Sequence, residues 1–175
     1  AQIKSTKSQS LFYNELIESN EGFPDGTRYI LENSREFPDV LGTVADMFQI
    51  EEDFRDALET GLGDISHCLI AKNKKTALKT LEKAKNNNAG DLTIIPLKES
   101  INLKSEFKNI PDNKLIIGRA SDLIYTSKSL RPLANYLLGN LLIVSDLVSA
   151  SKNKFLIGWS LVDRNGSYIG EDLIL

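Results

Sequence analysis

The sequence predicts a mixed α/β domain made of two similar halves, each with a small sheet and flanking helices. Three observations indicate this fold. Short apolar runs alternate with helical patterns along most of the chain, which is typical of α/β proteins. The second half repeats the order of turn and capping residues found in the first. The length of 175 residues suits one large domain or two small ones.

The first half is predicted to alternate helices with strands. Predicted helices span residues 27–34, 51–60 and 73–87, and predicted strands span residues 65–71 and 92–97. Residues 42–48 are expected to form a short strand or a turn into one. Gly63 is placed to end the second of these helices, because glycine is common just after a helix C-terminus. Asn73 can cap the third, whose expected apolar face consists of Ala77, Leu78, Leu81 and Ala84. Before these elements, Ser10 could cap a short helix.

The second half repeats the first at an offset of 76 residues. The identical pairs are Gly42 and Gly118, Asp46 and Asp122, Arg55 and Arg131, Leu62 and Leu138, and Gly63 and Gly139. Strands are expected at residues 141–145, 154–157 and 160–169, the last with an Asn165-Gly166 type I′ turn. The polar stretch 98–113 separates the repeats. We therefore expect one subdomain over residues 21–110 and a second over residues 111–175.

Composition excludes several classes of protein. Lys and Arg number 21 against 24 Asp and Glu, so binding to nucleic acid would require a local basic patch. One Cys and one His exclude a disulfide framework and a Cys- or His-rich metal site. No apolar run approaches the roughly 18 residues of a membrane span. Since the sequence has neither a signal peptide nor an initiator Met, we expect a domain of a longer cytosolic protein.

No group of residues predicts catalysis. Gly61-Leu62-Gly63 lacks the third glycine of a dinucleotide fingerprint and follows a helix, and there is no P-loop. The run Ser66-His67-Cys68 places neighbours on opposite faces of a strand, so Cys68 is expected in the core. Asp46 and Asp122 suit backbone hydrogen bonds at turns rather than a pair of catalytic carboxylates. We predict no catalytic residue, no cofactor and no metal.

Charge is distributed unevenly. Residues 46–64 hold seven acids and one Arg, whereas residues 72–85 hold six Lys and one Glu. Lys75, Lys79 and Lys83 lie four residues apart and form one stripe on the predicted helix. Together with Lys72, this stripe could neutralise phosphates without reading sequence. The alternative interpretation is a solvated helix face.

Glycines crowd the end of the chain. Gly158, Gly166 and Gly170 fall among the last strands, together with apolar residues and Tyr168. Glycine inside a strand often marks the close approach of another backbone. This segment therefore predicts a sheet edge that could pair with a second chain, although turns and a bulge would explain the same residues.

Taken in order, these residues resemble the hinge domain of SMC (structural maintenance of chromosomes) proteins along the whole chain. The matching segments are Glu21-Gly22-Phe23 with Gly26, Gly42-Thr43-Val44-Ala45-Asp46, Ala57-Leu58-Glu59, Leu62-Gly63, the helix around Ala77, residues 92–97, Leu137-Leu138-Gly139 and Val144-Ser145-Asp146-Leu147. Gly158, Gly166 and Gly170 resemble the family's final glycine signature. Two departures stand out: Glu171 replaces the last glycine, and Trp159 occupies the strict position of the first.

The resemblance implies a dimerisation module. Two hinges form a two-fold, ring-like dimer in which the first subdomain of each copy meets the second subdomain of the other through paired strands. The interface residues carried over are Gly158, Gly166, Tyr168 and Gly170. The likeness to bacterial hinges implies a homodimer, and residues 1–20 would be a coiled-coil stub. The isolated hinge would not be an enzyme, because ATP hydrolysis in this family belongs to head domains.

The resemblance also implies a role in chromosome condensation and segregation. The hinge would close a ring around DNA, with weak, non-specific DNA contact through Lys72, Lys75, Lys79 and Lys83. The parent protein would be cytoplasmic and nucleoid-associated, would bind a kleisin and accessory subunits at its heads, and would have no membrane partner. Two alternatives remain: a monomeric nucleic-acid-binding module that uses residues 72–85, and a small α/β enzyme.

Overall fold

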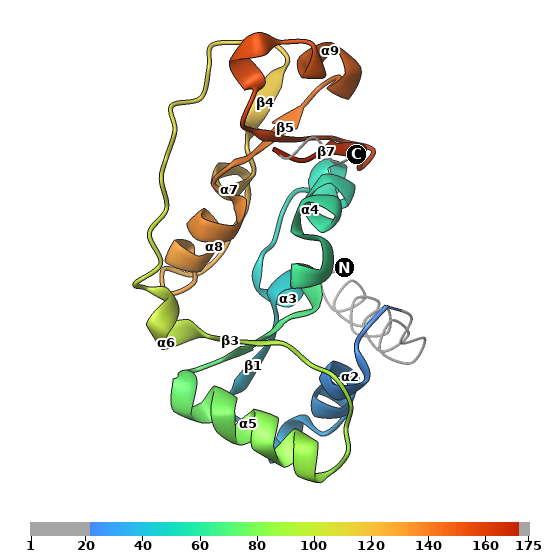
Figure 1. Cartoon of the computed structure of the whole chain (residues 1–175), viewed down its shortest axis with the longest axis vertical. Coiled ribbons are helices and arrows are strands. Elements are labelled where there is room, and N and C mark those ends of the chain that lie inside the picture. The colour runs from blue at the N-terminus through green and yellow to red at the C-terminus, as the bar shows by residue number, and fades with distance from the viewer. Residues whose placement is uncertain (1–21, 172–175) are drawn as a thin grey trace, which may run out of the picture.

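The computed structural model describes residues 22–171. Two small sheets lie toward opposite ends of an elongated molecule, with helices between them (Figure 1). The predicted helix after Ser10 and the predicted coiled-coil stub over residues 1–20 lie outside the described residues. The predicted division at residue 110 falls in the segment that connects the two halves.

The elements of the first half are α2 (Asp25–Glu32), η1 (Ser34–Glu36), β1 (Val40–Thr43), α3 (Val44–Met47), η2 (Glu52–Phe54), α4 (Arg55–Leu62), η3 (Gly63–His67), β2 (Leu69–Ala71), α5 (Lys74–Asn86), β3 (Ile94–Pro96) and α6 (Leu97–Ser100). Those of the second half are β4 (Ile116–Arg119), α7 (Ala120–Leu123), α8 (Arg131–Leu138), β5 (Leu141–Val144), α9 (Leu147–Ser151), η4 (Lys154–Leu156), β6 (Ser160–Asp163) and β7 (Tyr168–Ile169). The elements labelled η are 3₁₀ helices.

The strand pairings confirm the predicted repeat. In the first sheet, β1 is antiparallel to β2, and β2 is parallel to β3. In the second sheet, β4 is antiparallel to β5, and β5 is parallel to β6. Each first strand has a register irregularity that ends at a glycine, Gly42 or Gly118. The strand orders are β1-β2-β3 and β4-β5-β6-β7, so the second sheet has one strand more.

The two halves meet around a local two-fold axis. The amide of Gln49 donates to the carbonyl of Tyr125 at 3.0 Å, and the amide of Tyr125 donates to the carbonyl of Gln49 at 2.7 Å. These two residues are equivalent in the repeat, since the offset of 76 relates them. Equivalent residues that bond each other reciprocally lie on the symmetry axis. The internal repeat is therefore also a spatial pseudo-symmetry.

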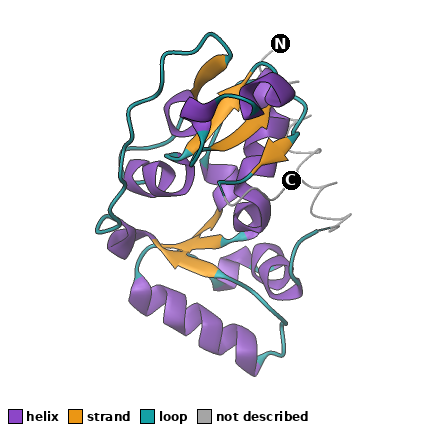
Figure 2. Cartoon of the chain, turned by 45° about the horizontal axis from the view of Figure 1, so that its top comes forward, coloured by secondary structure: helices purple, strands orange, loops and turns teal. Residues whose placement is uncertain are grey.

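The largest hydrophobic core is shared by both halves. It contains Val44, Phe48, Ala57, Leu58, Leu62, Cys68 and Ile70 from the first half, and Ala120, Ile124, Leu130, Leu133, Ala134, Leu138, Leu141, Ile143 and Val162 from the second. Helix α4 crosses to the second half and packs against β6. The outer face of the first sheet is covered by α5, which lies on the side away from the second sheet (Figure 2).

Local capping changes the expected strand over residues 42–48. Strand β1 ends at Thr43, and helix α3 begins at once. The hydroxyl of Thr43 accepts from the amide of Asp46 at 3.3 Å, and the Asp46 carboxylate accepts from the amide of Thr43 at 3.2 Å. This reciprocal capping box satisfies two amides at the helix start and confirms the expected backbone-bonding role of Asp46. Asp122 is exposed and does not cap α7.

Two further predicted strands are wrong in part or whole. Within residues 65–71, only Leu69–Ala71 is extended, because the chain up to His67 continues as η3 with the Ser66 hydroxyl donating to the Gly63 carbonyl at 2.7 Å. Residues 154–157 contain η4 instead of a strand. The Asn153 side chain caps η4 by accepting from the amide of Phe155 at 2.9 Å. Both differences arise from local side-chain to backbone bonds that an apolar pattern does not reveal.

Helix α5 begins as expected but turns a different face to the core. The Asn73 side chain accepts from the Thr76 amide at 2.9 Å, which confirms the predicted N-cap. Ala77 and Ala84 are buried as expected, together with Thr80. Leu78 and Leu81 are exposed, so their assignment to the core face is wrong.

The shared core predicts energetic coupling between Gly61 of α4 and Leu141 of β5. A Cβ added at Gly61 would overlap Leu141 Cδ2. Gly→Ala in an exposed helix stabilises by about 1 kcal/mol, but here overpacking should make Gly61→Ala destabilising by roughly 1–3 kcal/mol. In a Leu141→Ala background the same change should be neutral or favourable. Urea unfolding of the four proteins measures this coupling, and additive effects would contradict the packing of α4 on the second sheet.

Candidate functional site

Strand β7 forms one edge of the second sheet, and Tyr168 begins it. Leu161 pairs with Ile169, and Val162 pairs with Tyr168. The amide of Asp163 donates to the carbonyl of Ser167 at 3.0 Å. Because hydrogen-bonded and non-hydrogen-bonded pairs alternate along an antiparallel ladder, Tyr168 belongs to a non-hydrogen-bonded pair. Its amide and carbonyl therefore point away from β6, toward the free edge.

The turn between β6 and β7 differs from the predicted type I′ turn. That turn needs a positive φ at both central residues, and Asn165 has none, whereas Gly166 has φ +83°. The amide of Gly166 donates to the carbonyl of Asp163 at 3.1 Å, and the Asp163 carboxylate accepts from the amides of Asn165 and Ser167 at 3.0 Å each. The loop is a three-residue hairpin connection with Gly166 in the left-handed position.

Gly166 makes its close approach within the chain. A Cβ at this position would lie 2.8 Å from the Thr60 hydroxyl and 3.4 Å from the Asp56 carbonyl, both in α4. Nearby, the Arg164 guanidinium lies over the Phe54 ring, 5.5 Å from its centroid. The glycine thus lets the β6–β7 hairpin rest on the helix that the first half contributes to the shared core.

Gly158 and Gly170 lie at the opposite end of β6 and β7. The Gly158 carbonyl accepts from Lys108 Nζ and from Asn140 Nδ2, each at 3.0 Å. Gly170 is buried directly after β7. The four residues predicted for the interface therefore occur on one hairpin, but Gly158 and Gly166 are at its two ends and both have contacts within the chain.

The most exposed large apolar side chains of the described residues lie in the connection from β5 to β6. Val148, Phe155 and Ile157 expose 65%, 79% and 77% of their surface, more than the other large hydrophobic residues of the described chain. They belong to the connection from β5 to β6, in which α9 packs against both β6 and β7. The sequence pattern did not identify these residues as exposed, because an apolar residue in a short connection between strands is expected to be buried.

The first sheet has a comparable edge at β3. The amide of Leu69 donates to the carbonyl of Thr93 at 2.9 Å, and Leu69 pairs in parallel with Ile94. In a parallel ladder, a residue bonds the two neighbours of its partner, so the amide and carbonyl of Ile94 face away from β2. Pro96 follows at the next outward position, where its missing N–H costs no ladder bond.

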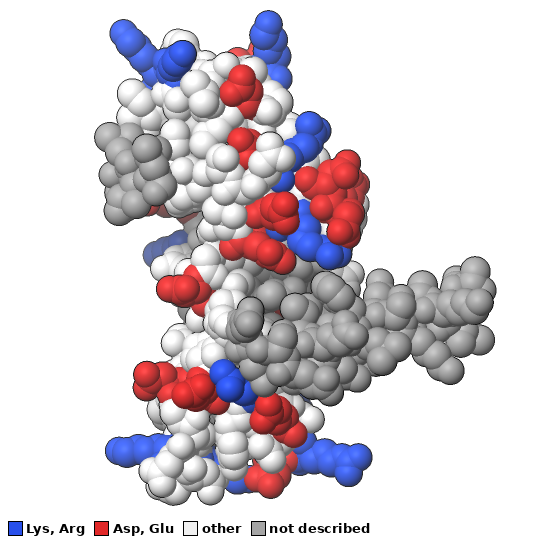
Figure 3. Space-filling model, turned by 90° about the vertical axis from the view of Figure 1, so that its right-hand side faces the viewer, with Lys and Arg blue, Asp and Glu red and all other residues white. Residues whose placement is uncertain are grey.

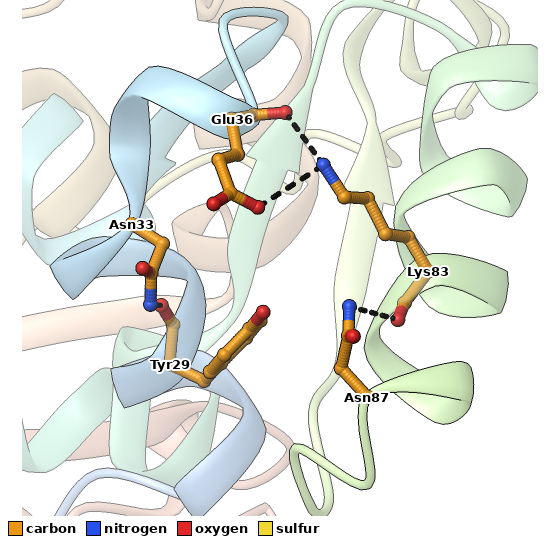
Figure 4. Close-up of polar contacts among 5 residues, drawn as sticks. All are labelled: Tyr29, Asn33, Glu36, Lys83 and Asn87. Carbon is orange, nitrogen blue, oxygen red and sulfur yellow. Dashed lines mark hydrogen bonds and ion pairs between the residues drawn. The ribbon is translucent and has the colours of Figure 1, made fainter.

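The four predicted DNA-binding lysines line one side of α5 and the approach to it. Lys72 forms an ion pair with Asp39 at 2.8 Å. Lys83 forms an ion pair with Glu36 at 3.2 Å and donates to the Glu36 carbonyl (Figure 4). Its Nζ also lies 4.7 Å from the centroid of the Phe37 ring. Lys75 and Lys79 line a groove of about 650 Å³ between α5 and residues 36–40, and form no ion pair within the described chain.

Lys and Arg side chains project from both ends of the molecule. Figure 3 shows them at the top and at the bottom of one face, and shows acidic side chains together with further Lys and Arg side chains between the two ends. The lower basic end is consistent with the six Lys of residues 72–85. The projecting cations at the ends would attract a phosphate backbone.

Cys68 and His67, the side chains considered for nucleophilic catalysis, make packing contacts within the fold. Cys68 is buried, and burial raises the pKa of its thiol, with a further contribution from the Asp64 carboxylate, so the reactive thiolate is disfavoured. The His67 ring contacts Phe23, with 5.0 Å between ring centroids.

Between residues 22 and 171, no three His, Cys, Asp or Glu side chains are grouped to hold a metal ion. No helix in that range is long and apolar enough to cross a membrane.

Comparison with known proteins identifies the family. The model of the SMC proteins flexible hinge domain matches residues 37–153. The chromosome partition protein Smc of Halothermothrix orenii is 31% identical over 139 residues, which are 78% of this chain and 12% of that protein. The Smc of Bacillus subtilis is 26% identical over 159 residues, 89% of this chain and 13% of that protein. The chain thus spans only about an eighth of the length of these relatives.

Solved hinge structures share the fold. A crystal structure of an asymmetric dimer of the Geobacillus stearothermophilus SMC hinge domain has a TM-score of 0.80 at 22% identity, over 97% of this chain and 69% of that one. The Pyrococcus furiosus SMC hinge domain has a TM-score of 0.68 at 21% identity, over 84% of this chain and 77% of that one. The expected fold class is confirmed. Since the family model covers well over half of its residues, this chain belongs to the SMC flexible hinge domain family, a family of hinges rather than of enzymes.

Proposed function

We propose that this chain is the dimerisation module of a chromosome-partition SMC protein, and that two copies join β3 of each to β7 of the other. One observation carries the proposal. Within residues 22–171, the first sheet is one strand short of its repeat, and the missing strand is the equivalent of β7. A β7 supplied by a second copy would complete that sheet. The solved dimer of a related hinge supports self-association.

The orientation of backbone groups supports this pairing. Ile94 and Tyr168 each turn an amide and a carbonyl to a free edge, as derived above from the ladders. The opposite edges, β1 and β4, carry irregularities at Gly42 and Gly118, and such bulges discourage strand addition. A two-fold operation makes both β3–β7 junctions at once, so the assembly closes as a ring of two instead of a filament.

Exposed apolar side chains near β7 are consistent with the same pairing. Helix α9 packs against β7, and the connection from β5 to β6 to which α9 belongs exposes Val148, Phe155 and Ile157. Exposed apolar surface can mark a protein interaction site. Strand pairing would fix the register of two copies, and burial of these side chains would add the hydrophobic contribution that backbone bonds alone do not supply.

Substitution of Tyr168 tests the pairing directly. Tyr168→Pro removes the outward amide without removing a β6–β7 ladder bond, whereas Tyr168→Ala removes the side chain and keeps the amide. We expect the native chain to have twice its 19.5 kDa mass by light scattering, the Ala variant to remain largely dimeric, and the Pro variant to be monomeric but folded. Gly166 is unsuitable for this test, because substitution there would also disturb its contact with α4.

Two results would contradict the proposal. The first is a native chain that remains at 19.5 kDa at every concentration measured. The second is a folded Tyr168→Pro variant that dimerises as tightly as Tyr168→Ala. Circular dichroism and the melting temperature of each variant show whether its fold is retained.

The proposed function includes closure of a ring around DNA, with weak DNA contact at α5. Within the longer parent protein, a dimer of hinges would join two arms at one end, while a kleisin and accessory subunits would join the heads at the other. Lys75 and Lys79 support the DNA contact, because they are exposed and have no acidic partner among residues 22–171, unlike Lys72 and Lys83. Such a role would place the protein at the nucleoid.

The salt dependence of DNA binding separates this contact from a general charge effect. Lys75→Gln with Lys79→Gln should reduce the slope of log K against log salt by about two, since each phosphate contact contributes roughly 0.9. The matched control is Lys74→Gln with Lys85→Gln, which removes the same charge from another face of α5. Fluorescence anisotropy with a short duplex measures both. Equal losses in the two variants, or no binding by the native chain, would contradict the proposed contact.

A further inference from the structure

The segment between the two halves is anchored to the second half. It runs from α6 to β4 along one side of the molecule (Figure 1). The Arg119 guanidinium lies 4.8 Å from the centroid of the Phe107 ring and donates a hydrogen bond to the carbonyl of Lys108. Arg119 itself is buried, and also lies 5.6 Å from the centroid of the Trp159 ring. One buried cation therefore holds two residues of the connecting segment.

Lys108 extends this attachment to the end of the second sheet. Its Nζ lies 5.6 Å from the centroid of the Trp159 ring and donates to the carbonyl of Gly158 at 3.0 Å. The Gly158 carbonyl also accepts from Asn140 Nδ2 at 3.0 Å. A single carbonyl thus joins the connecting segment to the loop that precedes β5.

Asn140 carries the contacts on to the end of β7. Its Nδ2 donates to the Glu171 carboxylate at 2.5 Å, and the Glu171 amide donates to the Ser160 hydroxyl at 3.3 Å. Glu171 and Trp159 are the two positions at which the chain departs from the glycine pattern seen in the sequence. At Glu171 and Trp159, this chain therefore has side chains that make contacts, whereas the glycine pattern has no side chain at either position.

We infer that residues 107–108 act as a strap that holds the end of β7 in place. The contacts run from Lys108 through Gly158 and Asn140 to Glu171. A two-residue edge strand has few bonds of its own, so its order depends on such neighbours. Since β7 is the proposed interface strand, this inference rests on the proposed function: a strand ordered in advance loses less entropy when a second copy binds.

Lys108→Met tests the strap, because it keeps the length of the side chain and removes its donor. Lys104→Met is the matched control, an exposed lysine of the same segment. We expect amide hydrogen exchange to accelerate about threefold in Lys108→Met at Ile169, whose amide faces β6, and at Glu171, whose amide donates to the Ser160 hydroxyl, and to be unchanged in Lys104→Met. The dimer dissociation constant should rise by a similar factor. Exchange is compared at a low concentration, so that dimerisation does not protect the strand.

A double-mutant cycle completes the test. In a Glu171→Ala background, Lys108→Met should no longer change exchange at Ile169, because the path to β7 is already broken. Unchanged exchange in Lys108→Met, or an equal change in both backgrounds, would overturn the strap. If exchange responds as expected but the native chain never dimerises, the strap stands and the proposed function fails.

Discussion

The packing of α4 against the sheet of the opposite half is the contact on which the rest of the structure depends. It brings Gly61 against Leu141 and buries the inner face of β5 and β6. The outer faces of the two sheets are covered by α5 and α9. With both faces of each sheet covered, the sheets themselves offer a second copy only their strand edges.

Pseudo-symmetry organises the two halves, and its exceptions mark the specialised parts. Gln49 and Tyr125 meet on the axis, and both first strands are irregular at a glycine. At the position where Thr43 caps a helix in the first half, the second half has Arg119, which reaches the connecting segment instead. Strand β7 is the second exception. These two departures belong to the end of the molecule where the proposed interface and the strap lie.

Local signals were predictable from the sequence, and long-range contacts were not. The repeat, the fold class and the Asn73 cap follow from turn, capping and periodicity rules that involve near neighbours. The core face of α5 does not, because helical periodicity alone cannot distinguish Thr80 from Leu78 as the buried residue. Likewise, glycine spacing indicated a close approach at Gly166, but only the fold shows that α4 is its neighbour. Its predicted role at the dimer interface stays a prediction.

Scanning calorimetry tests most directly whether the two halves share one core. A chain whose helices pack on the opposite sheet cannot lose one half without exposing the inner face of the other. We therefore expect a single unfolding transition in which both halves melt together. The calorimetric enthalpy should equal the van't Hoff enthalpy when both are expressed for that cooperative unit. Two separable transitions, one for each half, would contradict the shared core.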